Sequence, residues 1–143
     1  MKEGLKVLVA YDGSKESKDA VAAAADIAER FKGSVTVLNV YWDPLEEKYE
    51  PVVEKTEKIS IGDRGSMRIL DDVEPLLKKR KIKFDLRMER NPNVPKTILR
   101  IAEDENYGCI ALGSRGVGGA RAWLLGSVSS RVIAEATCPV IVV

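Results

Sequence analysis

The sequence predicts one α/β domain in which helices cover both faces of a parallel β-sheet. Short apolar runs, typical of buried strands, alternate with longer segments whose apolar residues recur at helical spacing. This alternation favours a parallel sheet with right-handed crossovers. A glycine-rich loop joins a late apolar run to a helical segment, and such junctions bind anions. We therefore expect a single domain over residues 1–143, with a Rossmann-like, open, five-stranded parallel sheet.

The composition excludes several classes of protein. A chain of 143 residues, 45% hydrophobic and 31% charged, is long enough to bury the core of one domain. Its 23 basic and 22 acidic residues give a net charge of +1, which argues against a basic nucleic-acid-binding face. No apolar run reaches the roughly 20 residues that a membrane span needs. No leader segment is evident, so we expect a cytoplasmic protein without a membrane anchor.

Cysteine and histidine usage narrows the chemistry further. Cys109 and Cys138 lie in or beside strand-like segments, and we interpret them as thiols in a reducing compartment rather than as a disulfide or metal site. The chain has no histidine, which removes the commonest general base and the commonest metal ligand. We therefore expect no protein metal centre and assign no catalytic residue.

The first part of the chain predicts a strand, a helix and a second strand. Residues 5–10 form a short apolar strand, and Ser14 is a favourable N-cap for a helix over residues 15–31. Gly33 ends this helix, and the β-branched segment 34–40 is the second strand. The buried stripe of the helix is expected to comprise Ala20, Ala24, Ile27, Ala28 and Phe31.

Residues 41–61 are irregular. They contain two prolines and six acidic residues against three lysines. We interpret the segment as a surface excursion, part loop and part helix. It is either a lid or contact surface, or a plain solvated insertion.

The next segment predicts a helix that a proline interrupts. Apolar residues recur at helical spacing over residues 67–77, and Pro75 should kink or split the helix near Asp71. The basic run 78–81 is either an anion-binding patch or a set of cations that complements the helix C-terminus. The alternating segment 82–88 predicts a third strand with one more solvated face.

The last part of the chain repeats the helix–strand alternation. Pro95 stands in the first turn of a helix whose buried stripe is formed by Ile98, Ile101 and Ala102. Residues 108–112 form the fourth strand, and a helix over residues 128–136 follows the glycine loop. Pro139 stops that helix, and residues 140–143 form the fifth strand.

The stretch from Leu112 to Arg131 is the strongest functional signal. Glycines let backbone N–H groups approach a ligand closely, and the first amides of a helix have no intrahelical partner. The loop glycines are Gly113, Gly116, Gly118, Gly119 and Gly126. The turn around Asp12 also follows a strand. If the first and fourth strands are neighbours, the two loops share one crevice at the carboxyl edge of the sheet. We interpret this crevice as a nucleotide phosphate site.

Two familiar phosphate motifs do not fit this loop. The P-loop pattern requires a lysine where Gly119 stands, and the dinucleotide pattern requires a third glycine where Arg121 stands. What remains is Gly113, two residues, Gly116, nine residues, and then Gly126 followed by serine.

This G-x2-G-x9-G-[ST] spacing after the fourth strand resembles the ATP-binding branch of the universal stress protein family. The likeness extends to Val-Ala-Tyr-Asp-Gly-Ser at residues 9–14 and to residues 136–143, and it covers nearly the whole chain. Residues 41–61 fall where that family is most variable.

The resemblance implies roles for the matching positions. Asp12 would contact the ribose or the phosphates, and the backbone around Ala10 and Val40 would meet the adenine. Mg²⁺ would lie between the phosphates of ATP. The remaining positions of the expected site are Tyr11 in the first turn, Leu112 and Gly113 in its lining, and Arg115, Gly116, Gly126, Ser127, Val128 and Ser129 around the phosphates.

Several of these residues also have a structural interpretation. Asp12 could instead cap the first helix, and Ser127 and Ser129 could be ordinary residues of a helix N-terminus. Arg115 either reaches phosphate oxygens or is solvated.

The expected function is an ATP-binding stress-response regulator or nucleotide-dependent switch. The alternatives are a slow ATPase, for which positioned catalytic groups are lacking, and a nucleotide-free dimeric scaffold. The resemblance also implies a homodimer formed through the last strand. Residues 140–143 support this independently, because an apolar strand at a sheet edge favours pairing.

Overall fold

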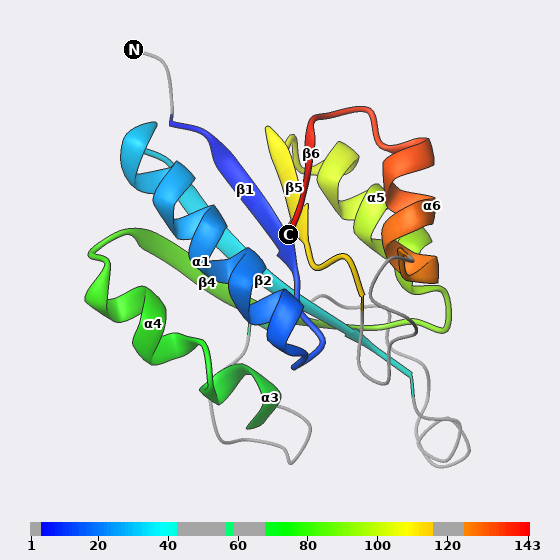
Figure 1. The fold of residues 1–143 in the computed structure, drawn as a ribbon, viewed down its shortest axis with the longest axis horizontal. Helices are drawn as coiled ribbons and strands as arrows, with labels where there is room; N and C mark the ends of the chain where they lie inside the picture. The colour runs from blue at the N-terminus through cyan, green and yellow to red at the C-terminus, as the bar shows by residue number, and fades with distance from the viewer. Residues whose placement is uncertain (1–3, 43–56, 59–67, 116–124) are drawn as a thin grey trace.

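The structure of the protein is a computed structural model that describes residues 4–42, 57–58, 68–115 and 125–143 (Figure 1). Its sheet has the strand order β3-β4-β2-β1-β5-β6. The strands are β1 (Lys6–Ala10), β2 (Ser34–Tyr41), β3 (Glu57–Lys58), β4 (Lys83–Arg90), β5 (Cys109–Leu112) and β6 (Val140–Val142). The helices are α1 (Lys15–Arg30), α3 (Arg68–Asp71), α4 (Glu74–Lys79), α5 (Val94–Asp104) and α6 (Ser127–Glu135).

The five predicted strands are confirmed as one parallel sheet. β1 pairs with β2 and β5, β2 pairs with β4, and β5 pairs with β6, all in parallel. The structure adds a strand that the sequence did not predict. The two residues of β3 pair antiparallel with β4 at the outer edge of the sheet. They belong to the irregular excursion, of which residues 43–56 and 59–61 lie outside the described part of the chain.

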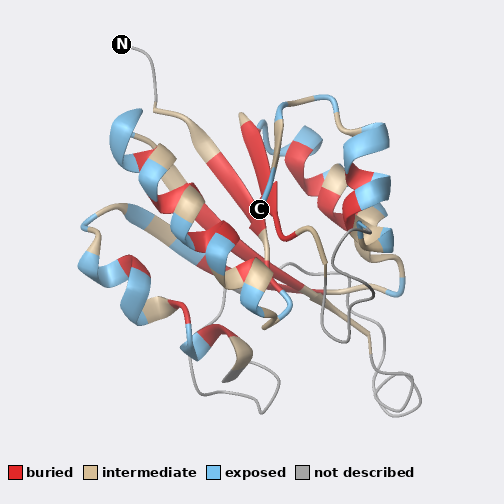
Figure 2. Cartoon of the chain, viewed as in Figure 1, coloured by how far each residue is buried: buried red, intermediate tan, exposed pale blue. Residues whose placement is uncertain are grey.

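Helices cover both faces of the sheet, as predicted. Figure 1 shows α1, α3 and α4 on one face and α5 and α6 on the other. Each layer has its own apolar cluster. The first joins α1 and the α3–α4 segment to β1, β2 and β4, and the second joins α5 and α6 to β1, β2 and β5. In Figure 2 the buried residues run along the central strands and along the inward sides of these helices. No helix in the described ranges is long and apolar enough to cross a membrane.

Helix α1 begins where the sequence predicts and ends one residue earlier. Ser14 is its N-cap, and the Ser14 hydroxyl accepts a hydrogen bond from the Ser17 amide at 3.1 Å. The predicted buried stripe is wrong at its last position, because Phe31 is 62% exposed. Phe31 is the C-cap of α1, and Lys32 follows with a left-handed φ of 52°. The helical period therefore no longer sets the direction of the Phe31 side chain.

Pro75 splits the helix of this region, as predicted. Helix α3 ends at Asp71, and α4 starts again at Glu74 with Pro75 in its first turn, where a missing N–H removes no helical hydrogen bond.

The basic run at residues 78–81 provides ion pairs. Arg80 contacts Asp26 and Glu29 of α1, with a 2.7 Å distance from Arg80 Nε to Glu29 Oε1, and Lys78 pairs with Glu74. Arg80 thus fastens α4 to α1.

The expected solvated face of β4 is only partly solvated. Lys83 and Asp85 are exposed, but Arg87 and Glu89 on the same face are buried. The alternation of polar residues therefore predicted the strand correctly but not the burial of its second half. Arg100 of α5 and Glu105 just after that helix pair with Glu89 and Arg87 there.

Both cysteines are free thiols, as the sequence analysis expected. Cys109 is buried in β5, and Cys138 is partly buried before β6. Burial raises the pKa of both thiols, which favours the protonated and less reactive form.

The turn between α1 and β2 offers a matched pair of substitutions. A Cβ atom at Gly33 would lie 1.8 Å from the carbonyl oxygen of Leu5, which accepts the Ser34 amide. Gly33→Ala should therefore reduce the free energy of unfolding by at least about 2 kcal/mol. The neighbouring change Lys32→Gly should be neutral or stabilising by up to about 1 kcal/mol, because it relieves a left-handed side-chain residue. Urea unfolding measures both, and equal effects at the two positions would contradict this account.

Candidate functional site

The strand order places the two predicted loops side by side. From β1 the chain continues to β2 and β4 on one side, whereas β5 and β6 lie on the other side of β1. The order therefore reverses between β1 and β5, whose residues Ala10 and Leu112 are register partners. Ligands of open α/β sheets bind at such a switch point, beyond the carboxyl ends of the strands. The turn after β1 and the loop after β5 meet here, as expected.

A cavity of about 510 Å³ opens at this switch point. Its volume lies within the range of about 300–1,000 Å³ that is typical of small-molecule sites. Eleven of the twelve predicted site residues line the cavity, and the twelfth, Gly116, lies outside the described residues. The eleven are Ala10, Tyr11, Asp12, Val40, Leu112, Gly113, Arg115, Gly126, Ser127, Val128 and Ser129.

The cavity also has a wall that the sequence analysis did not assign. Val94 and Ile98 of α5 line it, together with Leu38 of β2. Ile98 was predicted as a buried position, but helical spacing cannot tell a core contact from a cavity contact. The side of the cavity formed by β2 and α5 is thus apolar. The side formed by the β1 turn, the β5 loop and α6 carries Asp12, Arg115 and the serines of α6.

The N-terminus of α6 presents to this wall backbone donors that have no acceptor within the helix. Its N-cap is Gly126, and no side chain caps the helix. The first backbone hydrogen bond of the helix runs from the Ser130 amide to the Gly126 carbonyl at 3.0 Å. The amides of Ser127, Val128 and Ser129 precede it and have no intrahelical acceptor. The helix dipole adds positive potential, so this end of the cavity favours an anion.

Side-chain and backbone hydrogen bonds hold the β5 loop against α6. The Ser129 hydroxyl is buried and donates to the Gly113 carbonyl at 2.7 Å. The Gly126 amide donates to the Ser114 carbonyl, also at 2.7 Å. The hydroxyl proton of Ser129 therefore has a structural role, and its backbone amide is the group that remains for a ligand.

Gly113 is required by packing as well as by any ligand. A Cβ atom at this position would lie 2.7 Å from Cβ of Glu16 and 2.8 Å from its carbonyl carbon. The spacing of the loop glycines indicated only a role in ligand approach. The structure corrects that reason, because the first turn of α1 passes directly over the loop.

Asp12 and Arg115 both line the cavity and both contact residues at the start of α1. Asp12 lines the cavity, and its Oδ1 atom accepts the Ser14 amide at 2.9 Å, which shapes the turn before α1. Arg115 lines the cavity and pairs with Glu16 of α1, with 3.0 Å between Nη2 and Oε1. The polar wall is thus organised around the start of α1.

Tyr11 contributes to the site mainly through its backbone. Its carbonyl accepts a hydrogen bond from Nδ2 of the buried Asn39 at 2.9 Å, and its ring packs in the α1 core. Its buried hydroxyl has no hydrogen-bond partner within the described residues. Burial, with the charges of Asp72 and Asp12, raises the pKa of Tyr11 from 10.0 to about 12.

The described ranges hold no group of three or more acidic, cysteine or histidine side chains that would bind a metal ion.

The raised pKa of Tyr11 predicts a specific loss of stability in alkali. The phenol ionises near pH 10 in the unfolded chain and near pH 12 in the folded one, so its contribution to stability is complete below pH 10 and is lost between pH 10 and 12. Tyr11→Phe should remove that loss and should leave stability at pH 7 unchanged or slightly higher, since no described residue bonds to the hydroxyl. Urea unfolding of both proteins from pH 7 to 11.5 measures the difference. Parallel curves for the two proteins would refute this prediction.

The comparisons with known proteins follow the same architecture. The family model described as the universal stress protein family matches residues 5–143. The chain belongs to the universal stress protein family. It is 31% identical to a universal stress protein of Thermus aquaticus, over 96% of both chains. It is 28% identical to universal stress protein YxiE of Bacillus subtilis, over 96% of this chain and 97% of the relative.

Solved structures share this universal stress protein fold. The hypothetical protein MJ0577 superposes with a TM-score of 0.77 at 22% identity, over 99% of this chain and 96% of its own. A universal stress protein in complex with cAMP has a TM-score of 0.70 at 20% identity, over 99% and 98% of the two chains. A universal stress protein of Archaeoglobus fulgidus in complex with dAMP has a TM-score of 0.63 at 19% identity, over 99% and 97%.

Proposed function

We propose that this universal stress protein binds an adenine nucleotide, ATP in particular, and acts as a nucleotide-dependent switch in a stress response. The observation that carries the proposal is the uncapped N-terminus of α6 in the wall of the cavity. Free amides and a helix dipole favour phosphate, while the apolar side formed by β2 and α5 suits a flat base. The site therefore offers separate chemistry for each end of a nucleotide.

Two structural relatives support the choice of an adenine nucleotide. One was solved in complex with cAMP and the other in complex with dAMP. These ligands share an adenine base and a phosphate. We extend the shared chemistry to this chain because its own cavity lies at the switch point and combines an apolar wall with an anion-binding helix end.

Asp12 limits how the phosphates can lie. A carboxylate beside phosphate is repulsive unless a cation or a hydroxyl group separates them. Asp12 therefore suits either the ribose hydroxyls or a Mg²⁺ ion shared with the phosphates, because Mg²⁺ typically binds one or two protein carboxylates and keeps other ligands from substrate and water. Arg115, which is already paired with Glu16, contributes positive charge at the same wall.

We propose a switch rather than an enzyme. Phosphoryl transfer needs an oriented water and positioned charge. The cavity lining in the described residues contains one carboxylate, Asp12, and no second acid or base to share that work. Binding beside the start of α6 would instead change the surface that a partner recognises.

A change at Gly126 separates nucleotide binding from fold stability. In Gly126→Asp the new carboxylate should cap α6 and stabilise the protein without ligand by up to about 1 kcal/mol. The same carboxylate should repel phosphate and occupy an amide, so the affinity for ATP should fall at least tenfold. Gly126→Asn is the matched uncharged control and should lose less affinity.

Isothermal titration with ATP and thermal melting measure both quantities. At ATP concentrations a hundredfold above Kd, the wild-type protein should gain about 2.7 kcal/mol of stability. A nucleotide-free scaffold would show no ATP-dependent melting shift in wild type or variant, and that result would refute the proposed function.

We further propose that the protein forms a homodimer through β6. This strand is the last in the sheet order, so no other described strand pairs with its outer edge. Val142 and Val143 are 36% and 38% exposed, and Ile133 of the neighbouring α6 is also exposed. An apolar open edge favours pairing with a second copy, which would also cover these side chains.

The direction of the backbone groups in β6 supplies a test of the dimer. The Pro139 carbonyl and the Val143 amide bond to β5, so the strand alternation turns the Val142 amide outward. Val142→Pro removes an outward donor that the fold does not use. It should convert a dimer to a monomer in light-scattering measurements, and the monomer should still unfold cooperatively, with a melting temperature that no longer depends on protein concentration. A wild-type protein that is monomeric at high micromolar concentration would disprove the dimer proposal.

A further inference from the structure

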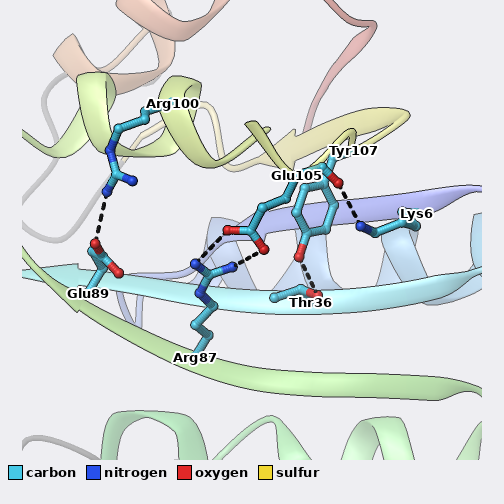
Figure 3. A network of polar contacts seen from close by, with 7 residues as sticks. All are labelled: Lys6, Thr36, Arg87, Glu89, Arg100, Glu105 and Tyr107. Carbon is cyan, nitrogen blue, oxygen red and sulfur yellow. Dashed lines mark hydrogen bonds and ion pairs between the residues drawn. The ribbon is translucent and has the colours of Figure 1, made fainter. Parts of the chain in front are cut away.

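A layer of ion pairs lies between α5 and the sheet (Figure 3). Arg87 of β4 makes a two-point contact with Glu105 at the end of α5, with distances of 2.8 Å from Nη1 to Oε1 and 2.7 Å from Nη2 to Oε2. Arg100 of α5 contacts Glu89 of β4, with 2.9 Å between Nη2 and Oε1. Arg87 and Glu89 are 9% and 8% exposed, whereas the side chains of their partners Glu105 and Arg100 are 42% and 46% exposed. The layer is therefore buried on the side of the sheet and solvated on the side of the helix.

These pairs adjoin the apolar side of the cavity. In the register between β2 and β4, Arg87 is the partner of Leu38 and Glu89 is the partner of Val40. Leu38 and Val40 line the cavity together with Val94 and Ile98 of α5, and the four side chains belong to one apolar cluster. The ion pairs therefore join α5, which lies on the apolar side of the cavity, to the strand next to β2 in the sheet.

Directional contacts also hold the C-terminal end of α5 to the central strands. Tyr107 donates from its hydroxyl to Thr36 Oγ1 of β2 at 2.9 Å, and Lys6 Nζ of β1 donates to the Glu105 carbonyl at 2.7 Å (Figure 3). Two-point arginine–carboxylate contacts fix both distance and orientation, whereas apolar packing is not directional. The polar layer is therefore the part of this interface that can set the angle of α5 over the sheet.

We propose that the Arg87–Glu105 and Glu89–Arg100 pairs are positioning elements that set the width of the base end of the cavity. The four side chains do not line the cavity, and they act through Val94 and Ile98 of α5. The inference rests on the proposed nucleotide site and deepens it. In this inference, charged side chains outside the cavity help to determine how tightly the nucleoside part of the ligand binds.

The test compares ATP with adenosine, which lacks the phosphates. Arg87→Met keeps the aliphatic length of the side chain and removes its two-point contact. It should weaken the binding of both ligands by the same factor, about threefold to thirtyfold. Arg100→Met, at a more exposed side chain, should have a smaller effect in the same direction. Titrations followed by the methyl NMR signals of Val94 and Ile98 give the Kd values.

A matched control comes from the other face of the sheet. Arg80 also contacts two carboxylates and fastens α4 to α1, and it does not line the cavity. Arg80→Met should lower the melting temperature and leave both Kd values within twofold of wild type. A purely structural role for Arg87 would produce the same pattern as Arg80.

A double-mutant cycle shows whether Arg87 and Glu105 act as a unit. If they do, Arg87→Met combined with Glu105→Gln should weaken binding no more than either change alone. Folded Arg87→Met protein with unchanged Kd values, or with a loss for ATP but not for adenosine, would overturn the inference while the nucleotide site stands. A wild-type protein that binds neither ligand would overturn the proposed function and this inference together.

Discussion

The constraint on which the rest of this structure depends is the parallel direction of β1, β2 and β5. Parallel strands end at one edge of the sheet, and the reversal of strand order at β1 leaves the loops after β1 and β5 without a covering crossover. The cavity forms at that point, and α6 begins beside it with an uncapped end. The cavity and backbone amides without intrahelical acceptors therefore lie at the same place, and the proposed phosphate site rests on both.

The two ends of the cavity are held by different forces. Backbone geometry holds the anion-binding end, where Ser129 donates to the Gly113 carbonyl and Gly113 has no space for a side chain beneath α1. Charge pairs hold the apolar end, where buried Arg87 anchors the end of α5. Removing Glu105 would take away a partner of the buried Arg87 charge, which is costly, and in some proteins ion pairs with a buried member specify an arrangement. The position of this charged layer next to the apolar side of the cavity is consistent with that use.

Much of the fold and most of the candidate site could be predicted from the sequence, because both depend on local patterns. Alternating apolar runs predicted the five parallel strands, and Pro75 predicted the break between α3 and α4. The errors arose where a residue's environment is set by distant parts of the chain. Phe31 follows the helical period but is exposed at the C-cap, and Arg87 looks solvated but is buried under Glu105. The α5 wall of the cavity was missed for the same reason, since no local pattern marks Ile98 as a cavity residue.

The central claim is that the first amides of α6 bind phosphate. Backbone ¹⁵N–¹H NMR during titration with ATP, and separately with adenosine, tests it most directly. The account predicts that the amide signals of Ser127, Val128 and Ser129 shift strongly with ATP and little with adenosine, because they have no intrahelical acceptor and meet only the phosphates. Saturation with ATP that leaves these three signals in place, while signals elsewhere move, would contradict the account.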